Sequence, residues 1–138
     1  MIRTSDILAC AVVVALALGA TPKSFAADDP VATKLKAWDP DHDGTIDLAE
    51  AKKAGEARFV ELNPDNDGTL DAKEAAGAKI TAQALAQADP DHDGTLDQNE
   101  YFTVLEERFK AADPDHDGTV SLSELKTQAG KALMVMMK

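Results

Sequence analysis

Four twelve-residue segments of this chain repeat one pattern of carboxylates around a central glycine. They read DPDHDGTIDLAE, NPDNDGTLDAKE, DPDHDGTLDQNE and DPDHDGTVSLSE, and they occupy residues 39–50, 63–74, 89–100 and 113–124. Their starts lie 24, 26 and 24 residues apart. Of the 25 acidic residues in the 138-residue chain, 18 lie in these segments. A disordered acidic chain would not gather its charge in this way, so the repeats favour four built cation sites over disorder.

The spacing within each repeat is that of an EF-hand loop. Such a loop supplies oxygen ligands from positions 1, 3, 5, 7, 9 and 12, with the backbone carbonyl used at position 7 and a bidentate glutamate at position 12. Glycine at position 6 allows the positive φ that turns the loop back on itself. The predicted metal ligands are Asp39, Asp41, Asp43, Thr45, Asp47 and Glu50 in loop 1; Asn63, Asp65, Asp67, Thr69, Asp71 and Glu74 in loop 2; Asp89, Asp91, Asp93, Thr95, Asp97 and Glu100 in loop 3; and Asp113, Asp115, Asp117, Thr119, Ser121 and Glu124 in loop 4.

The segments between the loops predict an all-α fold. Only 12 residues separate loop 1 from loop 2, and 12 separate loop 3 from loop 4. One helix must therefore leave the first loop of each of these pairs and lead into the next, in a compact bundle of about three helices. Aliphatic residues at position 8 suit short strands through which two loops pair, and the methionines and phenylalanines are expected mainly in the core.

Helices are expected over five segments. Residues 98–112 carry an apolar stripe at helical spacing. Residues 72–88 should break near Gly77 and restart with Thr81 as the N-cap. The expected helices cover residues 31–38, 48–62, 72–88 with its break, 98–112 and 122–137.

The first 26 residues have the pattern of a secretory signal peptide. A nearly unbroken apolar run over 7–20 is followed by small residues, and cleavage is expected after Ala26. The alternative is an uncleaved membrane anchor, but a run of 14 residues is short for a span of ~20. The sequence thus predicts an exported protein whose metal-binding domain occupies residues 27–138.

The composition of that domain excludes several classes of function. Cys10 is the only cysteine and lies within the signal, so no thiolate ligand or cysteine nucleophile remains. Setting aside Arg3, Lys23 and Asp6 leaves 12 basic and 24 acidic residues. This charge repels nucleic acids and anionic membranes, so neither is expected as a partner. The histidines all lie inside the loops, no nucleophile motif is present, and we expect no enzyme activity.

The repeats resemble lanmodulin, a family of small periplasmic EF-hand proteins that bind lanthanides. Proline at loop position 2 and aspartate at position 9 carry the resemblance. The matching residues are Pro40, Pro64, Pro90 and Pro114 at position 2, and Asp47, Asp71 and Asp97 at position 9. Two departures are Asn63, which opens loop 2, and Ser121 at position 9 of loop 4. In addition, histidine stands at position 4 of three loops, where the family often has lysine.

The resemblance implies a metal chaperone, buffer or carrier. Up to four lanthanide(III) ions would bind far more tightly than calcium and would drive the chain from a loose to a compact state. A lanthanide-dependent alcohol dehydrogenase or an uptake system is the implied partner. The charges agree with this implication, because a carboxylate at position 9 favours a trivalent over a divalent ion of similar size. Four trivalent ions would also balance the net charge of −12 that remains on residues 27–138.

Two other binding functions use the same loops. A periplasmic calcium buffer or sensor differs from a lanthanide protein only in relative affinity for the two ions. A dockerin-like, calcium-stabilised interaction module also repeats calcium loops at short spacing. Dockerins usually have two loops that end in aspartate, whereas the four loops here all end in glutamate.

Overall fold

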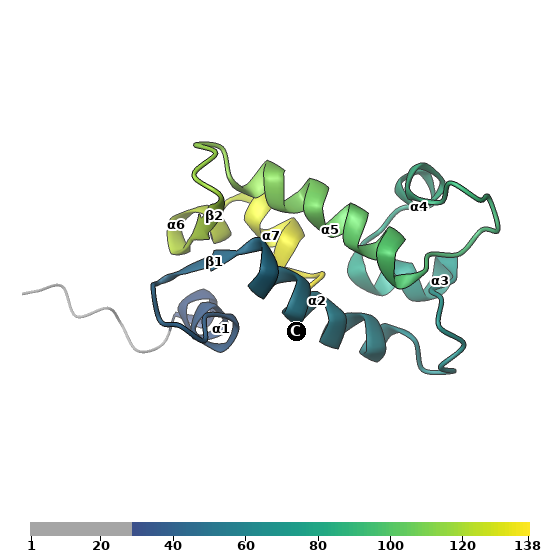
Figure 1. The fold of residues 1–138 in the computed structure, drawn as a ribbon, viewed down its shortest axis with the longest axis horizontal. Helices are drawn as coiled ribbons and strands as arrows, with labels where there is room; N and C mark the ends of the chain where they lie inside the picture. The colour runs from purple at the N-terminus through teal and green to yellow at the C-terminus, as the bar shows by residue number, and fades with distance from the viewer. Residues whose placement is uncertain (1–28) are drawn as a thin grey trace, which may run out of the picture.

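The computed structural model describes residues 29–138, and the predicted signal peptide lies outside the described residues. Seven α-helices and two short strands follow one another along the chain (Figure 1). In chain order they are α1 (Pro30–Trp38), β1 (Thr45–Asp47), α2 (Leu48–Leu62), α3 (Ala72–Ala75), the 3₁₀ turn η1 (Ala76–Ala78), α4 (Ala82–Ala88), α5 (Gln98–Ala112), β2 (Thr119–Ser121), α6 (Leu122–Leu125) and α7 (Gln128–Met134). The prediction of an all-α EF-hand fold is confirmed, with one small sheet added.

Helix α2 joins loop 1 directly to loop 2, as the short spacing predicts. Its N-cap is Asp47, which forms a reciprocal capping box with Glu50. The helix ends at Asn63, whose N–H donates to the carbonyl oxygen of Phe59 at 3.1 Å. Pro64 follows, and a residue before proline disfavours helical geometry. Positions 9 and 12 of one loop therefore begin the helix, and positions 1 and 2 of the next loop end it. Helix α5 joins loops 3 and 4 in the same way.

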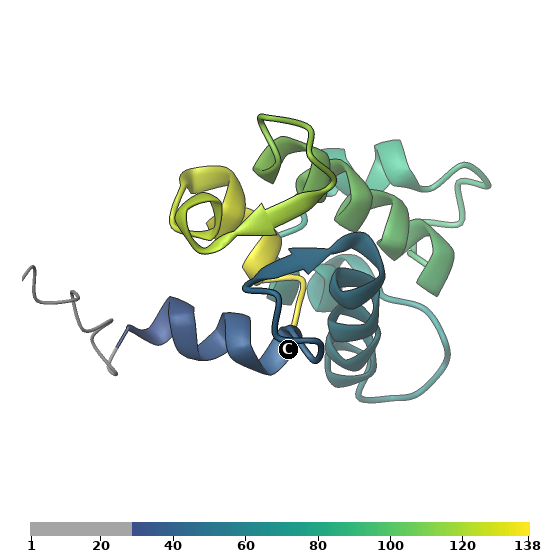
Figure 2. The same cartoon turned by 60° about the vertical axis from the view of Figure 1, so that its left-hand side comes forward.

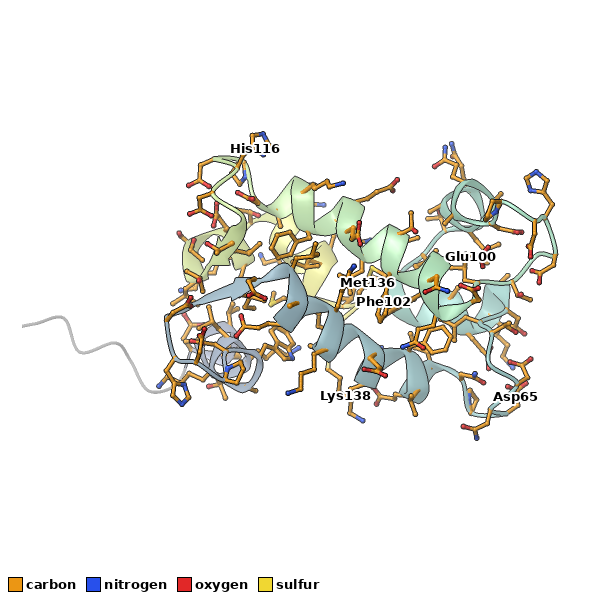
Figure 3. The ribbon with its side chains drawn as sticks, in the orientation of Figure 1. Asp65, Glu100, Phe102, His116, Met136 and Lys138 are labelled. Atoms are coloured by element: carbon orange, nitrogen blue, oxygen red, sulfur yellow. The ribbon has the colours of Figure 1, made fainter. Side chains whose placement is uncertain are left out.

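The core lies where α2, α5 and α7 pack together. Tyr101 of α5 is fully buried, and its ring meets Phe59 of α2 edge to face at a centroid distance of 5.4 Å. Its hydroxyl donates to the carbonyl oxygen of Met136 at 2.8 Å. Met136 and Met137 are buried, which confirms that these methionines serve the core (Figure 3).

The loops pair as 1 with 4 and as 2 with 3. Strands β1 and β2 are antiparallel, with Ile46 opposite Val120, and they join loop 1 to loop 4 (Figure 2). An isolated antiparallel bridge between Leu70 and Leu96 joins loop 2 to loop 3. The two pairs lie at opposite ends of α2 and α5 (Figure 1). The residues at position 8, all buried, thus link loops 1 and 4, which are distant in sequence, as well as the consecutive loops 2 and 3.

The expected break after loop 2 is confirmed. Helix α3 passes into η1, which contains Gly77, and α4 starts after Thr81, whose side chain accepts from the N–H of Ala84.

The single helix expected over 122–137 is wrong. The chain breaks between α6 and α7, where the hydroxyl of Thr127 donates to the carbonyl oxygen of Glu124 and accepts from the N–H of Gly130. A threonine that caps a new helix competes with continuation of the old one. Gly130 also lies so close to the backbone of Leu125 that a Cβ atom would collide with it. Helix α7 therefore turns back against α6 and carries the C-terminal methionines into the core. In the described part of the chain, no helix has the length and apolar character needed to cross a membrane.

Candidate metal centre

One polar residue is buried in every loop, and it always stands at position 1. Between residues 29 and 138, the buried polar or charged residues are Asp39, Asn63, Asp89 and Asp113, each at most 5% exposed. Position 1 is also where each incoming helix ends, so the end of the helix fixes this side chain at the base of its loop. Positions 2 to 6 of all four loops are exposed. A buried carboxylate is costly unless a cation or hydrogen bonds compensate for its charge.

The loop backbone bends around this buried side chain. In loop 1, the N–H of Gly44 donates to Oδ2 of Asp39 at 3.0 Å, and the N–H of Asp43 donates to its Oδ1 at 3.1 Å. The bend requires positive φ at position 6, where all four glycines lie between 85° and 93°. Position 4 is left-handed as well, at His42, Asn66, His92 and His116. The side chains at position 4 are exposed, and none of the histidines joins a cluster of carboxylates.

Three loops bring three carboxylates together. In each, one oxygen per residue lies within 4.8 Å of the others. The clusters are Asp39, Asp41 and Asp43 in loop 1; Asp89, Asp91 and Glu100 in loop 3; and Asp113, Asp115 and Glu124 in loop 4. No such acidic cluster occurs in loop 2 among the described residues, because its position 1 is the neutral Asn63. Figure 3 shows Asp65 of loop 2 and His116 of loop 4 at opposite ends of the molecule.

The residues at position 9 lie in helix caps rather than in these clusters. Oδ1 of Asp47 accepts from the N–H of Glu50 at 2.8 Å, and Oε2 of Glu50 accepts from the N–H of Asp47 at 2.9 Å. Asp71 and Asp97 form the same capping boxes. Ser121 does so with its hydroxyl, which also donates to Oε2 of Glu124 at 2.7 Å. One oxygen of each glutamate at position 12 therefore accepts from the position-9 N–H, and the other oxygen makes no such bond.

The pattern of ligand positions in the loops did not predict this capping role. An Asp or Ser followed three residues later by Glu is a capping-box signature and was visible in the sequence. The threonines at position 7 also bind locally, since N–H and Oγ1 of Thr45 both donate to Oδ1 of Asp43. That leaves the position-7 backbone carbonyl as the predicted ligand.

Two buried oxygens at position 1 are suited to bind a cation. Among the described residues, Oδ1 of Asn63 and Oδ1 of Asp89 are buried and accept no hydrogen bond. Buried oxygens without a donor are uncommon and call for a partner such as an ion or water. Because the donors gathered in the loops are carboxylate, amide and carbonyl oxygens, they fit a hard cation such as calcium or a lanthanide.

The carboxyl groups at position 1 have lowered pKa values. Burial raises the pKa of Asp39, but the hydrogen bonds that it accepts, chiefly from the N–H of Gly44, outweigh burial, and the net shift is downward. Asp89 and Asp113 are lowered in the same way.

Other ligands have raised pKa values. Burial is the main cause for Glu50 and Glu100, and the negative charges of the aspartates in each loop add to it. The pKa of Asp115 is raised chiefly by its hydrogen bond to Asp113. The carboxylates within each of these loops therefore repel one another when all are ionised, and a bound cation would relieve that repulsion.

Comparison with known proteins agrees with this geometry. Residues 105–127 match the family model described as EF hand, and they span the end of α5, loop 4 and α6. No curated protein matches the chain. The match and the acidic clusters fit an EF-hand protein that binds metal ions, and EF-hand proteins are generally binding proteins rather than enzymes.

Proposed function

We propose that this protein is a periplasmic lanthanide-binding protein that selects trivalent ions over calcium. The observation that carries the proposal is the buried position-1 oxygen at the base of every loop, with three of the four loops placing two further carboxylates beside it. Such a site gains most from the ion of highest charge, because the Coulomb energy of each contact scales with ionic charge.

Position 9 supplies the selectivity in this proposal. Asp47 and Asp97 bring loops 1 and 3 to five carboxylates each. In both residues Oδ1 caps the following helix, while Oδ2 accepts no hydrogen bond from the described residues. The second oxygen is therefore available to the ion, directly or through a bound water.

Calcium binding is the second candidate, and one observation favours it. The position-9 carboxylates lie outside all three acidic clusters, which leaves in each cluster three carboxylates of the kind that ordinary calcium loops use. Under this alternative the aspartates at position 9 serve only the helix caps.

A competition titration separates the two candidates. The calcium-loaded protein, in millimolar calcium, is titrated with chelator-buffered lanthanum. Lanthanide binding that persists supports the proposal, and displacement by calcium at comparable concentration establishes the calcium protein instead.

The matched variants isolate the charge at position 9. Asp47→Asn with Asp97→Asn keeps the caps, since Asn and Asp are comparable N-caps, but removes two charges. We expect the affinity for lanthanum to fall by at least tenfold more than the affinity for calcium. A loss of ~1.4 kcal/mol of Coulomb energy corresponds to a tenfold loss of affinity. Glu56→Gln with Glu107→Gln removes two charges outside the loops and should leave the preference unchanged.

The proposal also covers where the protein is located in the cell and which protein receives its metal. The resemblance to lanmodulin supports a carrier or buffer that supplies a lanthanide-dependent alcohol dehydrogenase or an uptake system. Cell fractionation with N-terminal sequencing tests the location, and a chain that starts at residue 27 in the periplasmic fraction is the expected result. Transfer of lanthanum from the loaded protein to the metal-free dehydrogenase tests delivery.

A further inference from the structure

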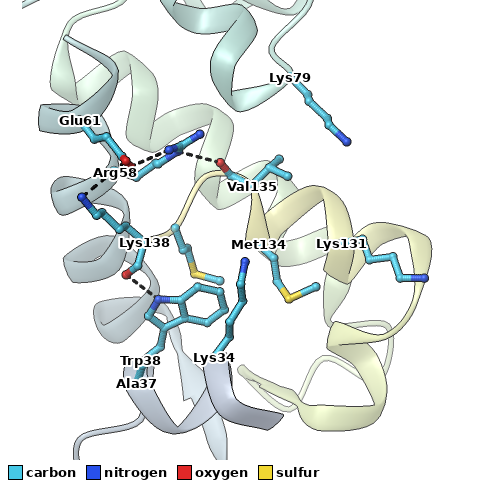
Figure 4. Close-up of a pocket in the computed structure, with 11 residues that line it drawn as sticks. Lys34, Ala37, Trp38, Arg58, Glu61, Lys79, Lys131, Met134, Val135 and Lys138 are labelled. Atoms are coloured by element: carbon cyan, nitrogen blue, oxygen red, sulfur yellow. Dashed lines mark hydrogen bonds and ion pairs between the residues drawn. The ribbon is translucent and has the colours of Figure 1, made fainter. Parts of the chain in front are cut away.

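A groove of about 600 Å³ lies on the molecule, and none of the predicted metal ligands lines it (Figure 4). Helix α1, helix α2, the turn at Lys79 and helix α7 with the following residues form its walls. Its volume is within the range of ~300–1,000 Å³ that small-molecule sites occupy. The lanthanide and calcium proposals make no use of these walls.

The charge of the groove is opposite to that of the protein. Five basic side chains line it, against a single acidic one, Glu61. The basic residues are Lys34, Arg58, Lys79, Lys131 and Lys138. Since residues 27–138 hold only 12 basic residues, the groove gathers five of them in a chain that is acidic elsewhere.

Three of these cations lack a carboxylate partner. Arg58 and Lys138 both pair with Glu61, at 2.6 and 3.5 Å. Among residues 29–138, no ion pair involves Lys34, Lys79 or Lys131. Like charges gathered without partners raise the local potential and attract an anion.

The floor of the groove is apolar and firmly held. Trp38 is 5% exposed, and its Nε1 donates to the main-chain oxygen of Lys138 at 2.6 Å. Nζ of Lys34 stands 5.8 Å from the centre of the Trp38 ring. Met134, Val135 and Met137 complete the apolar lining. A cation thus lies directly beside an apolar surface.

The turn that carries Lys79 is also fixed in place. Lys79 has a φ of 53°, a left-handed geometry that is unusual for a lysine. Arg108 holds the turn by donating to the carbonyl oxygens of Ala78 and Lys79, at 2.9 and 2.8 Å. The 3₁₀ turn η1 ends at Lys79, which explains this geometry, and Arg108 fixes the position of the backbone from which the Lys79 side chain extends.

We propose that this groove binds a small amphipathic organic anion. The apolar body would lie on Trp38 and the methionines, and a carboxylate, sulfonate or phosphate head would reach Lys34, Lys79 and Lys131. The concave shape and the size of the groove favour a small molecule over an extended protein segment, which needs a longer surface.

Octanesulfonate is a suitable probe because its head group competes poorly with carboxylates for the loop ions. The calcium-loaded protein is titrated by calorimetry and by the emission of Trp38, the only tryptophan in the chain. Binding of octanesulfonate at one site, with a change in Trp38 emission and unchanged circular dichroism, supports the proposal. Octanol lacks the charge and methanesulfonate lacks the apolar body, so each should bind at least tenfold more weakly.

Paired substitutions test the basic residues. Lys34→Gln with Lys131→Gln should weaken octanesulfonate binding by about tenfold and leave octanol unchanged. Lys36→Gln with Lys110→Gln removes the same charge outside the groove and should have no effect. Equal binding of octanesulfonate and octanol, or equal loss in both double variants, overturns the proposal. Tighter binding of a hexaglutamate peptide also overturns it and assigns the groove to an acidic protein segment. Metal titration of the same variants should be unchanged, which separates this site from the loops.

Discussion

Leu70 and Leu96 exchange two backbone hydrogen bonds, of 2.8 and 2.9 Å, and both side chains are fully buried. Each follows the position-7 residue of its loop, so the bridge joins the backbone of loop 2 to that of loop 3. Ordering one loop therefore orders the other before it binds an ion.

The first prediction is that cooperativity follows these contacts rather than neighbouring positions in the sequence. Glu100→Gln, which weakens loop 3, should also lower the affinity of loop 2, by about fivefold. Loops 1 and 4 should change much less. The amide signals of Gly44, Gly68, Gly94 and Gly118 report the four sites separately by nuclear magnetic resonance. If loop 4 weakens along with loop 3 while loop 2 is unaffected, the coupling runs through α5 and the prediction is wrong.

The second prediction concerns loop 4. Ser121 caps α6 with its hydroxyl and brings no charge to position 9. Ser121→Asp keeps a capping residue, adds a carboxylate and should tighten lanthanide binding at loop 4 by about tenfold, with a smaller gain for calcium. The Gly118 signal during competition with a chelator provides the measurement. Gln83→Asp, which adds the same charge at an exposed position of α4, is the control. A Gly118 titration that does not move would refute the assignment of position 9 as a ligand.

The third prediction concerns pH. The pKa values of Glu50 and Glu100 are raised, so the metal-free folded state holds these protons more tightly than the unfolded chain. Their contribution thus stabilises the metal-free fold as the pH falls toward the raised pKa values, and it is lost as the pH rises above them. The lowered pKa values of Asp39, Asp89 and Asp113 have the opposite effect. They stabilise the fold at a pH above the ordinary pKa of aspartic acid, and this stabilisation is lost as the pH falls through the lowered values.

Ion binding requires deprotonated carboxylates, so adding metal should release protons at a pH just above the ordinary pKa of glutamic acid. The release can be measured in weakly buffered solution. Glu50→Gln with Glu100→Gln should release fewer protons, whereas Glu56→Gln with Glu107→Gln should match the unmodified protein. No proton release at this pH, in a metal-free protein that circular dichroism shows to be folded, would contradict the raised pKa values.

The fourth prediction compares two glycines. A Cβ atom at Gly130 would collide with the backbone of Glu124 and Leu125, which cannot move without separating α6 from α7. At Gly77 the Cβ would meet only the end of the Leu62 side chain, at 2.6 Å, and that side chain can rotate away. We expect Gly130→Ala to lower the free energy of unfolding by about 3 kcal/mol and Gly77→Ala to lower it by less than about 1 kcal/mol. Thermal unfolding of the calcium-loaded proteins provides the comparison, and similar losses in both would show that α7 is not seated against α6.

The fifth prediction is that folding depends on metal. The structure gathers carboxylates whose mutual repulsion opposes the compact state when no ion is present. A ligand at a thousand times its dissociation constant adds ~4 kcal/mol per site, which over several sites equals the stability of an ordinary domain. Helicity measured by circular dichroism should rise sharply as two or three sites fill. Equal helicity in chelator and in metal would indicate a scaffold that folds without its ions.

Local patterns predicted much of this structure. Helices α2 and α5 have the expected bounds, 48–62 and 98–112, and Thr81 begins α4 as expected. The break at Thr127 was missed because the apolar residues before the C-terminus suggest one continuous helix, while the backbone contact at Gly130 depends on tertiary packing. The choice of loop partners could not be predicted either, since every position 8 is a similar aliphatic residue. The groove gathers residues from four separate segments, which no local pattern reveals.

Loops 2 and 3, which pair with each other, both lie in the sequence between loops 1 and 4, which form the outer pair. A chain that emerges from its N-terminus can complete the inner pair while loop 4 is still absent, but β1 must wait for β2, more than 70 residues later. The outer pair also closes the larger chain loop, which is the slower step in folding. In such a chain the first loop to emerge is therefore among the last to be completed. Ions would meet the inner pair first, and the sites would fill from the centre of the chain outward.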